Sequence, residues 1–195
     1  MCIRDKILNE SMKLFLEHGY NGVSLNMILN ACNISKGGFY HYFKSKEMLF
    51  NELMEERIFK EIRAPNELLN GNISTQSKIS SLIDYSFRYI AEIKHLIGED
   101  DFFGIYPLLF QGVINNKKLL RKLKLLYESY IELITKILKE GINNGEFSGD
   151  FNPRKMAYQL IFSIEGDILV WSITKDFNIK KHFDLTYDNF LKIIK

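Results

Sequence analysis

The segment SKGGFYHYFKSKE, residues 35–47, concentrates aromatic and basic side chains around two glycines. It holds four aromatic residues, one histidine and three lysines. Lysine ammonium groups and serine or tyrosine hydroxyls bind phosphate oxygens, and these contacts position a protein on a duplex. Two adjacent glycines stand where a helix should begin, although glycine is the weakest ordinary helix former. The composition therefore indicates contact with a phosphate backbone, together with a close approach of the protein main chain.

A helical wheel divides this segment into a buried and an exposed face. Phe39 and Phe43 are four residues apart, so we expect both on the buried face. The exposed face and its shoulders carry the residues able to meet a partner: Lys36, Gly37, Gly38, Tyr40 and His41. Lys46, with Ser45 before it, opens the next helix, whose N-terminus is able to hold another phosphate.

The segment before it supplies a second short helix. The pattern predicts helices over 25–31 and 36–42, begun by the N-cap residues Ser24 and Ser35. Only CNI separates them, and Asn33 suits a tight turn because asparagine tolerates a left-handed backbone. Two short helices with such a turn form a helix-turn-helix unit. The alternative is a small three-helix module whose charges are merely solvated.

The remaining chain is predicted to be all-α, with about nine helices and no sheet. Helical periodicity covers 3–18, 25–31, 36–42, 46–63, 75–96, 101–112, 116–143, 153–175 and 183–194. The stretch PNELLNGNIST, residues 65–75, has the composition of a loop. We predict an N-terminal helix-turn-helix domain over 1–48, linked through the helix 46–63 to a helical ligand-binding and dimerisation domain over 49–195.

Composition limits the function classes. The chain has 195 residues, 46% of them hydrophobic, and a formal net charge of only +2. The first fifty residues carry six Lys/Arg against four Asp/Glu, and the remainder carries 20 of each, so a nucleic-acid surface must be a local patch. Two cysteines are too few for a disulfide framework. We expect a cytoplasmic protein with neither signal peptide nor membrane span.

The sequence carries no pattern typical of an enzyme. Its four histidines are scattered, without a HExxH motif, paired cysteines, a nucleophile elbow or a phosphate-cradling glycine loop. We therefore predict no catalytic residues, no metal site and no cofactor.

Residues 7–50 resemble the DNA-binding domain of TetR-family transcriptional repressors. The shared marks are LFLEHGY, Ser24, ISKGGFYHYFKSKE and the following Leu49. The resemblance implies a homodimeric repressor that binds an operator in double-stranded DNA and whose variable C-terminal domain binds a small inducer. It also implies DNA contacts, largely to phosphates, by Ser24, Ser35, Lys36, Tyr40, His41 and Lys46.

The chain also departs from the family pattern. Asn26 stands where relatives often have a basic residue, and Gly38 where they have a hydroxyl residue or alanine. Leu29 and Cys32 replace small residues, and Asn33 replaces the usual turn glycine. These departures leave the operator sequence open. Asn26 remains able to pair with adenine through its amide, so it joins the predicted DNA contacts.

The helix predicted at 153–175 is apolar nearly all round, which indicates burial on more than one side. We predict that one stripe forms a two-fold interface together with the last helix, as in a four-helix bundle. That stripe is Ala157, Ile161, Ile164, Ile168 and Trp171. The alternative is the central core helix of a monomer.

Aromatic residues concentrate in the middle of the chain and suggest a ligand pocket. The candidates are Phe87, Phe103, Tyr106, Phe110, Tyr127, Tyr130, Phe162 and Glu165. An acid in a buried helix needs a partner. For Glu165 that partner is either a group of the protein, such as Arg88, Arg121 or a tyrosine hydroxyl, or a cationic inducer. The aromatic residues alternatively form plain core, and the protein would then be a DNA-binding regulator without a small-molecule switch.

Overall fold

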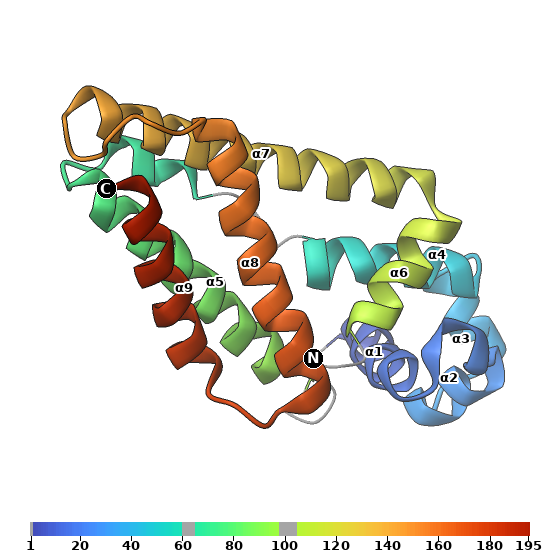
Figure 1. Cartoon of the computed structure of the whole chain (residues 1–195). Helices are drawn as coiled ribbons and strands as arrows, with labels where there is room; N and C mark the ends of the chain where they lie inside the picture. The colour runs from blue at the N-terminus through green and yellow to red at the C-terminus, as the bar shows by residue number, and fades with distance from the viewer. Residues whose placement is uncertain (1, 60–64, 98–104) are drawn as a thin grey trace. The chain divides into compact units, whose positions relative to one another are not determined.

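The computed structural model of the chain describes residues 2–59, 65–97 and 105–195. Over these residues the prediction of an all-α chain with nine α-helices is confirmed (Figure 1). The helices are α1 (Ile3–Gly22), α2 (Leu25–Cys32), α3 (Lys36–Tyr42), α4 (Lys46–Leu53), α5 (Thr75–Ile97), α6 (Ile105–Asn115), α7 (Lys117–Asn143), α8 (Pro153–Thr174) and α9 (Ile179–Ile194). A short 3-10 helix, Asn66–Asn70, lies in the stretch that the sequence marks as a loop.

The helix predicted over 46–63 differs from the expectation. Regular α-helix ends at Leu53, and a π-helix follows over Met54–Phe59. A π-helix hydrogen-bonds i→i+5 and shifts the helical register, which an apolar pattern with a period of 3.6 residues does not reveal. Met54 is fully buried at this junction, so the shift turns a large side chain into the core.

The chain divides into two compact units, one of residues 1–62 and 92–123 and the other of residues 63–91 and 124–195. In the first unit α1 packs against α2, α4 and α6. Its core is aromatic, with Phe15 edge-on to Phe50 at 5.3 Å between ring centroids, and with Phe39 fully buried. The boundary near residue 48 that the sequence suggests stays a prediction.

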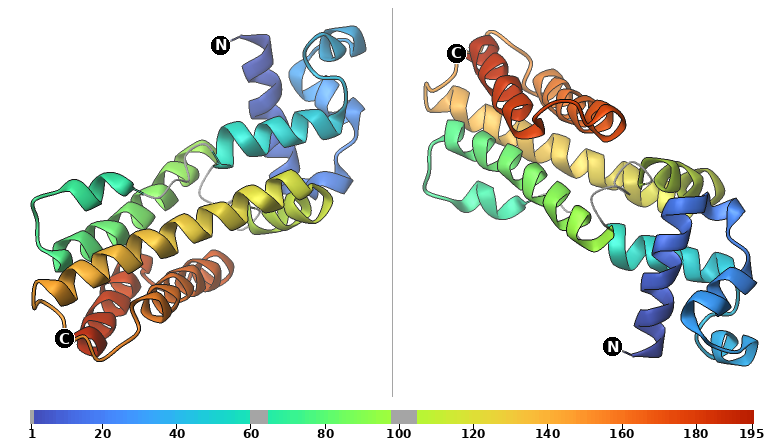
Figure 2. Two further views of the ribbon diagram at one scale, coloured as in Figure 1. Left: turned by 90° about the horizontal axis from the view of Figure 1, so that it is seen from above. Right: turned by 90° about the horizontal axis from the view of Figure 1, so that it is seen from below.

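The second unit is built on α8 and α9, which pack on each other and lie side by side in both views of Figure 2. The Thr186 hydroxyl of α9 donates a hydrogen bond of 2.7 Å to Asp167 of α8. Fully buried Leu138 of α7 and Phe183 of α9 belong to its core. Pro153 occupies the first turn of α8, as predicted, and Asn152 caps that helix.

One helix among the described residues, α8, is long and apolar enough to cross a membrane by length and composition alone. In its most apolar window 44% of the residues are buried inside the protein. The core helix of a soluble protein passes the same test, so this feature is weak evidence for a membrane span.

Candidate nucleic-acid interface

The helix-turn-helix geometry is present. Asn33 adopts the left-handed conformation, with φ 50° and ψ 53°, and its N–H bonds the Asn30 carbonyl at 3.1 Å. The Ile34 N–H bonds the Leu29 carbonyl, also at 3.1 Å, so the turn closes directly onto the end of α2. The asparagine that replaces the usual glycine therefore takes the required backbone conformation.

Serine hydroxyls begin the three helices α2, α3 and α4. The Oγ atoms of Ser24, Ser35 and Ser45 each accept a hydrogen bond from the N–H group three residues later in the chain, at 3.2, 3.1 and 3.0 Å. All three serines are exposed. A capping hydroxyl uses a lone pair for the helix and keeps its hydrogen, which remains available to a phosphate oxygen. Each helix start thus combines free backbone N–H groups with a hydroxyl donor.

The predicted buried face of α3 is confirmed by the burial of its two phenylalanines. Phe39 and Phe43 have no exposed surface. The remaining predicted contact residues lie on the outside: Lys36, Gly37, Tyr40 and His41 are exposed, and Gly38 is half-buried. The His41 ring meets Tyr42 edge-on, at 4.8 Å between centroids. Asn26, in the first turn of α2, is exposed as well.

Lys46 does not reach outward as predicted. Its ammonium donates to the carbonyl oxygens of Tyr20 and Val23, at 2.8 and 2.6 Å, and lies 4.2 Å from the centroid of the Tyr20 ring. Burial lowers the pKa of this ammonium. The predicted phosphate contact is thus directed to the protein's own main chain here. Sequence spacing does not reveal this, because the two carbonyls come from the end of α1.

One exposed cation was not among the predicted contacts. Lys44 lies between α3 and α4, directly before the exposed N-cap Ser45. The sequence could have indicated this residue, because it is the first lysine of FKSKE and directly precedes a predicted helix start.

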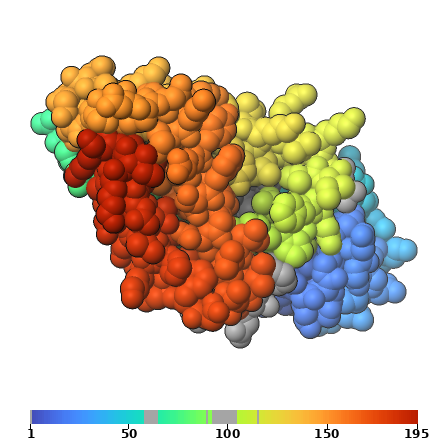
Figure 3. Space-filling view, viewed as in Figure 1, coloured from blue at the N-terminus to red at the C-terminus, as the bar shows by residue number. Residues whose placement is uncertain are grey.

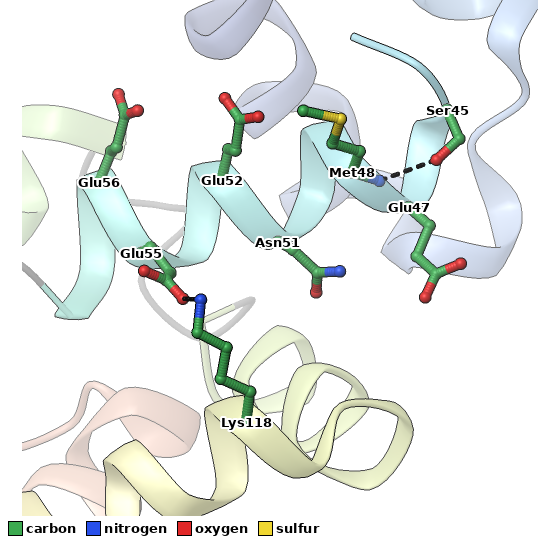
Figure 4. Close-up of a pocket in the computed structure, with 8 residues that line it drawn as sticks. All are labelled: Ser45, Glu47, Met48, Asn51, Glu52, Glu55, Glu56 and Lys118. Carbon is green, nitrogen blue, oxygen red and sulfur yellow. Dashed lines mark hydrogen bonds and ion pairs between the residues drawn. The ribbon is translucent and has the colours of Figure 1, made fainter.

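An open groove of about 420 Å³ runs along α4 (Figure 4). Its lining is rich in carboxylates: Ser45, Glu47, Met48, Asn51, Glu52, Glu55, Glu56 and Lys118. Arg4 of α1 bonds both Glu52 and Glu56, at 2.7 and 2.5 Å. In the π-helix that follows α4, Glu55 pairs with Lys118 and Lys122 at 3.1 and 2.5 Å. These ion pairs hold α1 and the start of α7 onto α4 and the π-helix, so they serve the structure of the unit.

The predicted pocket residues fall into both units. In the second unit, Tyr127 of α7 lies close to the Glu165 carboxylate of α8. Burial, followed by the interaction with Glu165, raises the pKa of Tyr127. Burial also raises the pKa of Tyr130, helped by Tyr85, Glu165 and Glu67. A tyrosine hydroxyl is one of the protein partners foreseen for Glu165.

The other residues predicted for the ligand pocket differ in burial, and one of them is not described. Phe87 and Tyr106 are half-buried, and Phe103 lies outside the described residues. Phe110 and Phe162 are 54% and 64% exposed, so the single chain does not enclose them, and their place in a ligand pocket stays a prediction. An apolar helix pattern cannot tell which of two apolar faces turns outward.

The same ambiguity affects the stripe of α8 that was predicted to form the dimer interface. Ala157, Ile161, Ile164, Ile168 and Trp171 are all buried within the single chain. The apolar residues that α8 exposes lie on the opposite face: Phe162, Leu169, Val170 and Ile173. A Cβ added to Gly166, on this exposed face, meets no described atom within 4 Å. Figure 3 shows α8 and α9 presented together on one side of their unit.

The sequence matches two family profiles. Residues 7–53 match "Bacterial regulatory proteins, tetR family", and residues 50–192 match "YsiA-like protein, C-terminal region". The second match covers most of the chain. The chain therefore belongs to the TetR family of helix-turn-helix transcriptional regulators, a family of DNA-binding proteins that are not enzymes.

Individual relatives agree with this assignment. The transcriptional regulator UidR of Escherichia coli K12 is 25% identical over 175 residues, covering 85% of this chain and 81% of the relative. The fatty acid metabolism regulator protein of Bacillus subtilis is 24% identical over 167 residues, with the same coverage of 85% and 81%. The crystal structure of FadR from Bacillus subtilis in complex with stearoyl-CoA has a TM-score of 0.70 at 20% identity, covering 98% of this chain and 99% of that one. At that identity the structural likeness establishes the fold.

Proposed function

We propose that this TetR-family regulator is a homodimeric repressor that binds an approximately palindromic operator and is released by a small lipophilic or cationic inducer. It acts in the cytoplasm, where bacterial DNA lies. The observation that carries the proposal is the outer surface of α3. The helix α3 is capped by Ser35 and held in place by the buried Phe39 and Phe43. Its outer surface offers a cation, a phenol, an imidazole and accessible main chain to the major groove.

The predicted DNA contacts divide by chemistry. Lys36, Tyr40 and the capping hydroxyls of Ser24 and Ser35 are suited to phosphates, since they are donors at exposed positions. His41 and Asn26 are the exposed side chains able to read base edges. With glycine at 37 and 38, few other side chains of α3 can do so, and part of the specificity then depends on DNA shape.

A two-fold dimer is supported by the exposed apolar face of α8. Phe162, Val170 and Ile173 are 64%, 50% and 59% exposed, and Gly166 lies open among them. Contiguous exposed apolar surface of this kind marks an association site. Leu185 and Ile193 of α9 are exposed as well, so both helices offer apolar side chains to a second copy. Two copies would present two α3 helices to successive major grooves.

Two chemical classes of inducer have support. The relative solved with stearoyl-CoA favours an acyl-CoA. The Glu165 carboxylate, set beside the hydroxyls of Tyr127 and the neighbouring Tyr130, favours a lipophilic cation. An inducer shifts the protein only through its different affinities for the DNA-bound and released states.

The deciding experiment begins with selection of a binding site from a random duplex library by the wild-type dimer. Binding to that site is then measured with stearoyl-CoA, with a lipophilic quaternary ammonium compound, and without addition. Release by either compound, together with thermal stabilisation of the free protein, supports a ligand-responsive repressor. A ligand at 100 times its Kd adds about 2.7 kcal/mol of stability. Operator binding that no lipophilic or cationic compound alters would support the alternative, a regulator controlled by a protein partner or by abundance.

A further inference from the structure

The corner between α1 and α2, residues 19–24, is held by a side chain from outside the helix-turn-helix. Gln111 of α6 accepts the Tyr20 N–H on its Oε1 atom at 2.8 Å. Gln111 is 91 residues away in the sequence, yet both residues belong to the same compact unit. In Figure 1 α6 lies directly beside α1.

Gly19 creates the geometry that this contact uses. Its φ of 69° and ψ of 165° are not helical, so α1 is kinked there. This region of backbone conformation is essentially reserved for glycine. A Cβ built on Gly19 would stand 3.4 Å from the Gln111 amide nitrogen, so the Gln111 side chain packs directly over the kink. The kink and the amide therefore form one contact between α6 and the end of α1.

Lys46 holds the same corner from α4. Its ammonium bonds the Tyr20 and Val23 carbonyls, at 2.8 and 2.6 Å. Val23 is almost fully buried and directly precedes Ser24, whose hydroxyl caps α2 at the Met27 N–H. The position of Ser24 thus depends on a corner whose main chain is bonded by α4 at two carbonyls and by α6 at one N–H.

We propose that Gln111 is a positioning residue for DNA binding: it fixes the α1–α2 corner and thereby the Ser24 hydroxyl and the N-terminus of α2. On this view α6 belongs to the DNA-reading unit, although α2 ends at Cys32 and α6 begins only at Ile105. The inference rests on DNA binding and on the placement of Ser24, and it needs neither the proposed inducer nor the proposed dimer.

The test compares three single variants. Gln111→Met keeps the length of the side chain and removes the acceptor, whereas Gln111→Glu keeps an oxygen acceptor. Asn51→Leu is the matched control, because it breaks a similar amide contact of this unit, the 2.8 Å bond from Asn116, without touching the corner. All three are measured by amide hydrogen exchange and by binding to a duplex selected by the wild-type protein.

Gln111→Met should speed exchange at the Tyr20 and Met27 amides by about 5-fold, as expected from losing one neutral hydrogen bond. The Gly38 amide, capped by Ser35, is the internal control and should not change. Gln111→Glu should restore the slow exchange, and Asn51→Leu should leave both corner amides unchanged. Unchanged exchange at Met27 in Gln111→Met would overturn the proposal, whatever the DNA data show.

Operator binding provides the second readout through a double-mutant cycle with Ser24→Ala. We expect Gln111→Met to weaken binding about 5-fold and to have little further effect once Ser24 is alanine, since residues acting through one another are not additive. Asn51→Leu should combine additively with Ser24→Ala. Full additivity for Gln111→Met, or no loss of operator affinity in that variant, would reject a positioning role.

Discussion

The Lys78 ammonium lies 2.7 and 2.8 Å from the two carboxylate oxygens of Glu140, and the lysine side chain is only 2% exposed. The same ammonium bonds the Leu69 carbonyl at 3.3 Å. One buried cation therefore joins α5, α7 and the 3-10 helix within the second unit. A buried charge is tolerated only when it is paired and hydrogen-bonded, as it is here.

Removing the carboxylate should destabilise this unit. We expect Glu140→Gln to lower the free energy of unfolding by about 2 kcal/mol, less than the roughly 3–5 typical of a fully buried pair, because Glu140 is 37% exposed. Urea denaturation followed by circular dichroism measures the change. The double variant Lys78→Met/Glu140→Gln should recover part of the loss, since no charge is then left buried without its partner. A double variant as unstable as the sum of the single changes would contradict this explanation.

The two lysines assigned to phosphate contacts should behave differently. Lys36→Ala should flatten the dependence of log Kd on log salt by about 0.9, the value for one lost phosphate contact. Lys46→Met should leave the salt slope unchanged and instead lower stability by about 2 kcal/mol, because it loses two charge-assisted hydrogen bonds to the α1–α2 corner. Binding titrations at several salt concentrations and thermal unfolding measure these effects. An equal loss of slope in both variants would show that Lys46 turns to DNA in the complex.

The exposed apolar face of α8 is the proposed dimer interface, so a charge placed on this face should weaken dimerisation. Val170→Glu should weaken dimerisation at least about 100-fold, since each copy would bury an unpaired carboxylate. Sedimentation equilibrium measures it. Ile73→Glu is the matched control, because Ile73 is exposed to a similar degree in the loop before α5. Ile164→Glu should unfold the unit rather than separate subunits, because Ile164 is buried within one chain.

A substitution at Glu165 tests whether the inducer is a lipophilic cation. Glu165→Gln should abolish release from the operator by a lipophilic cation and leave operator affinity unchanged, since α3 is untouched. Fluorescence anisotropy of a labelled operator measures both quantities. A variant that still responds fully to the cation would assign Glu165 a purely structural role with Tyr127.

Alkaline pH should weaken the second unit through Tyr127. Burial and the neighbouring carboxylate raise the pKa of Tyr127 in the folded protein above the value of about 10 in the unfolded chain. The unfolded state therefore loses its phenol proton first, and stability falls as pH rises above about 10. Stability against pH is measured by denaturation, with the phenolate absorbance followed in parallel. Tyr127→Phe should show a smaller alkaline loss, and an identical profile would contradict the assignment.

Periodicity and capping residues were sufficient to predict where α2, α3 and α4 begin. Ser24, Ser35 and Ser45 begin the helices predicted for them, and Asn33 makes the predicted turn. Phe39 and Phe43 are buried as their spacing requires. These features depend on residues close in sequence, whose chemistry acts on their own backbone.

The features that sequence missed depend on residues far apart. Lys46 turns to carbonyls at the end of α1, and Gln111 reaches the corner from α6. On α8 both faces are apolar, so the wheel could not show that Ile164 packs inside while Val170 faces outward. The π-helix at Met54 likewise breaks the period on which the wheel depends.

The two glycines of α3 have a consequence for how this protein can change. A Cβ on Gly37 or Gly38 would meet nothing closer than the Ser35 hydroxyl, at 3.8 and 3.5 Å, and neither residue has a positive φ. Alanine at either position fits the free protein and would stabilise the helix by about 1 kcal/mol. Larger side chains there would project toward base edges while Phe39 and Phe43 keep the helix seated. The reading surface is therefore separable from its scaffold, and a library varied at two positions is a route to new operator preferences.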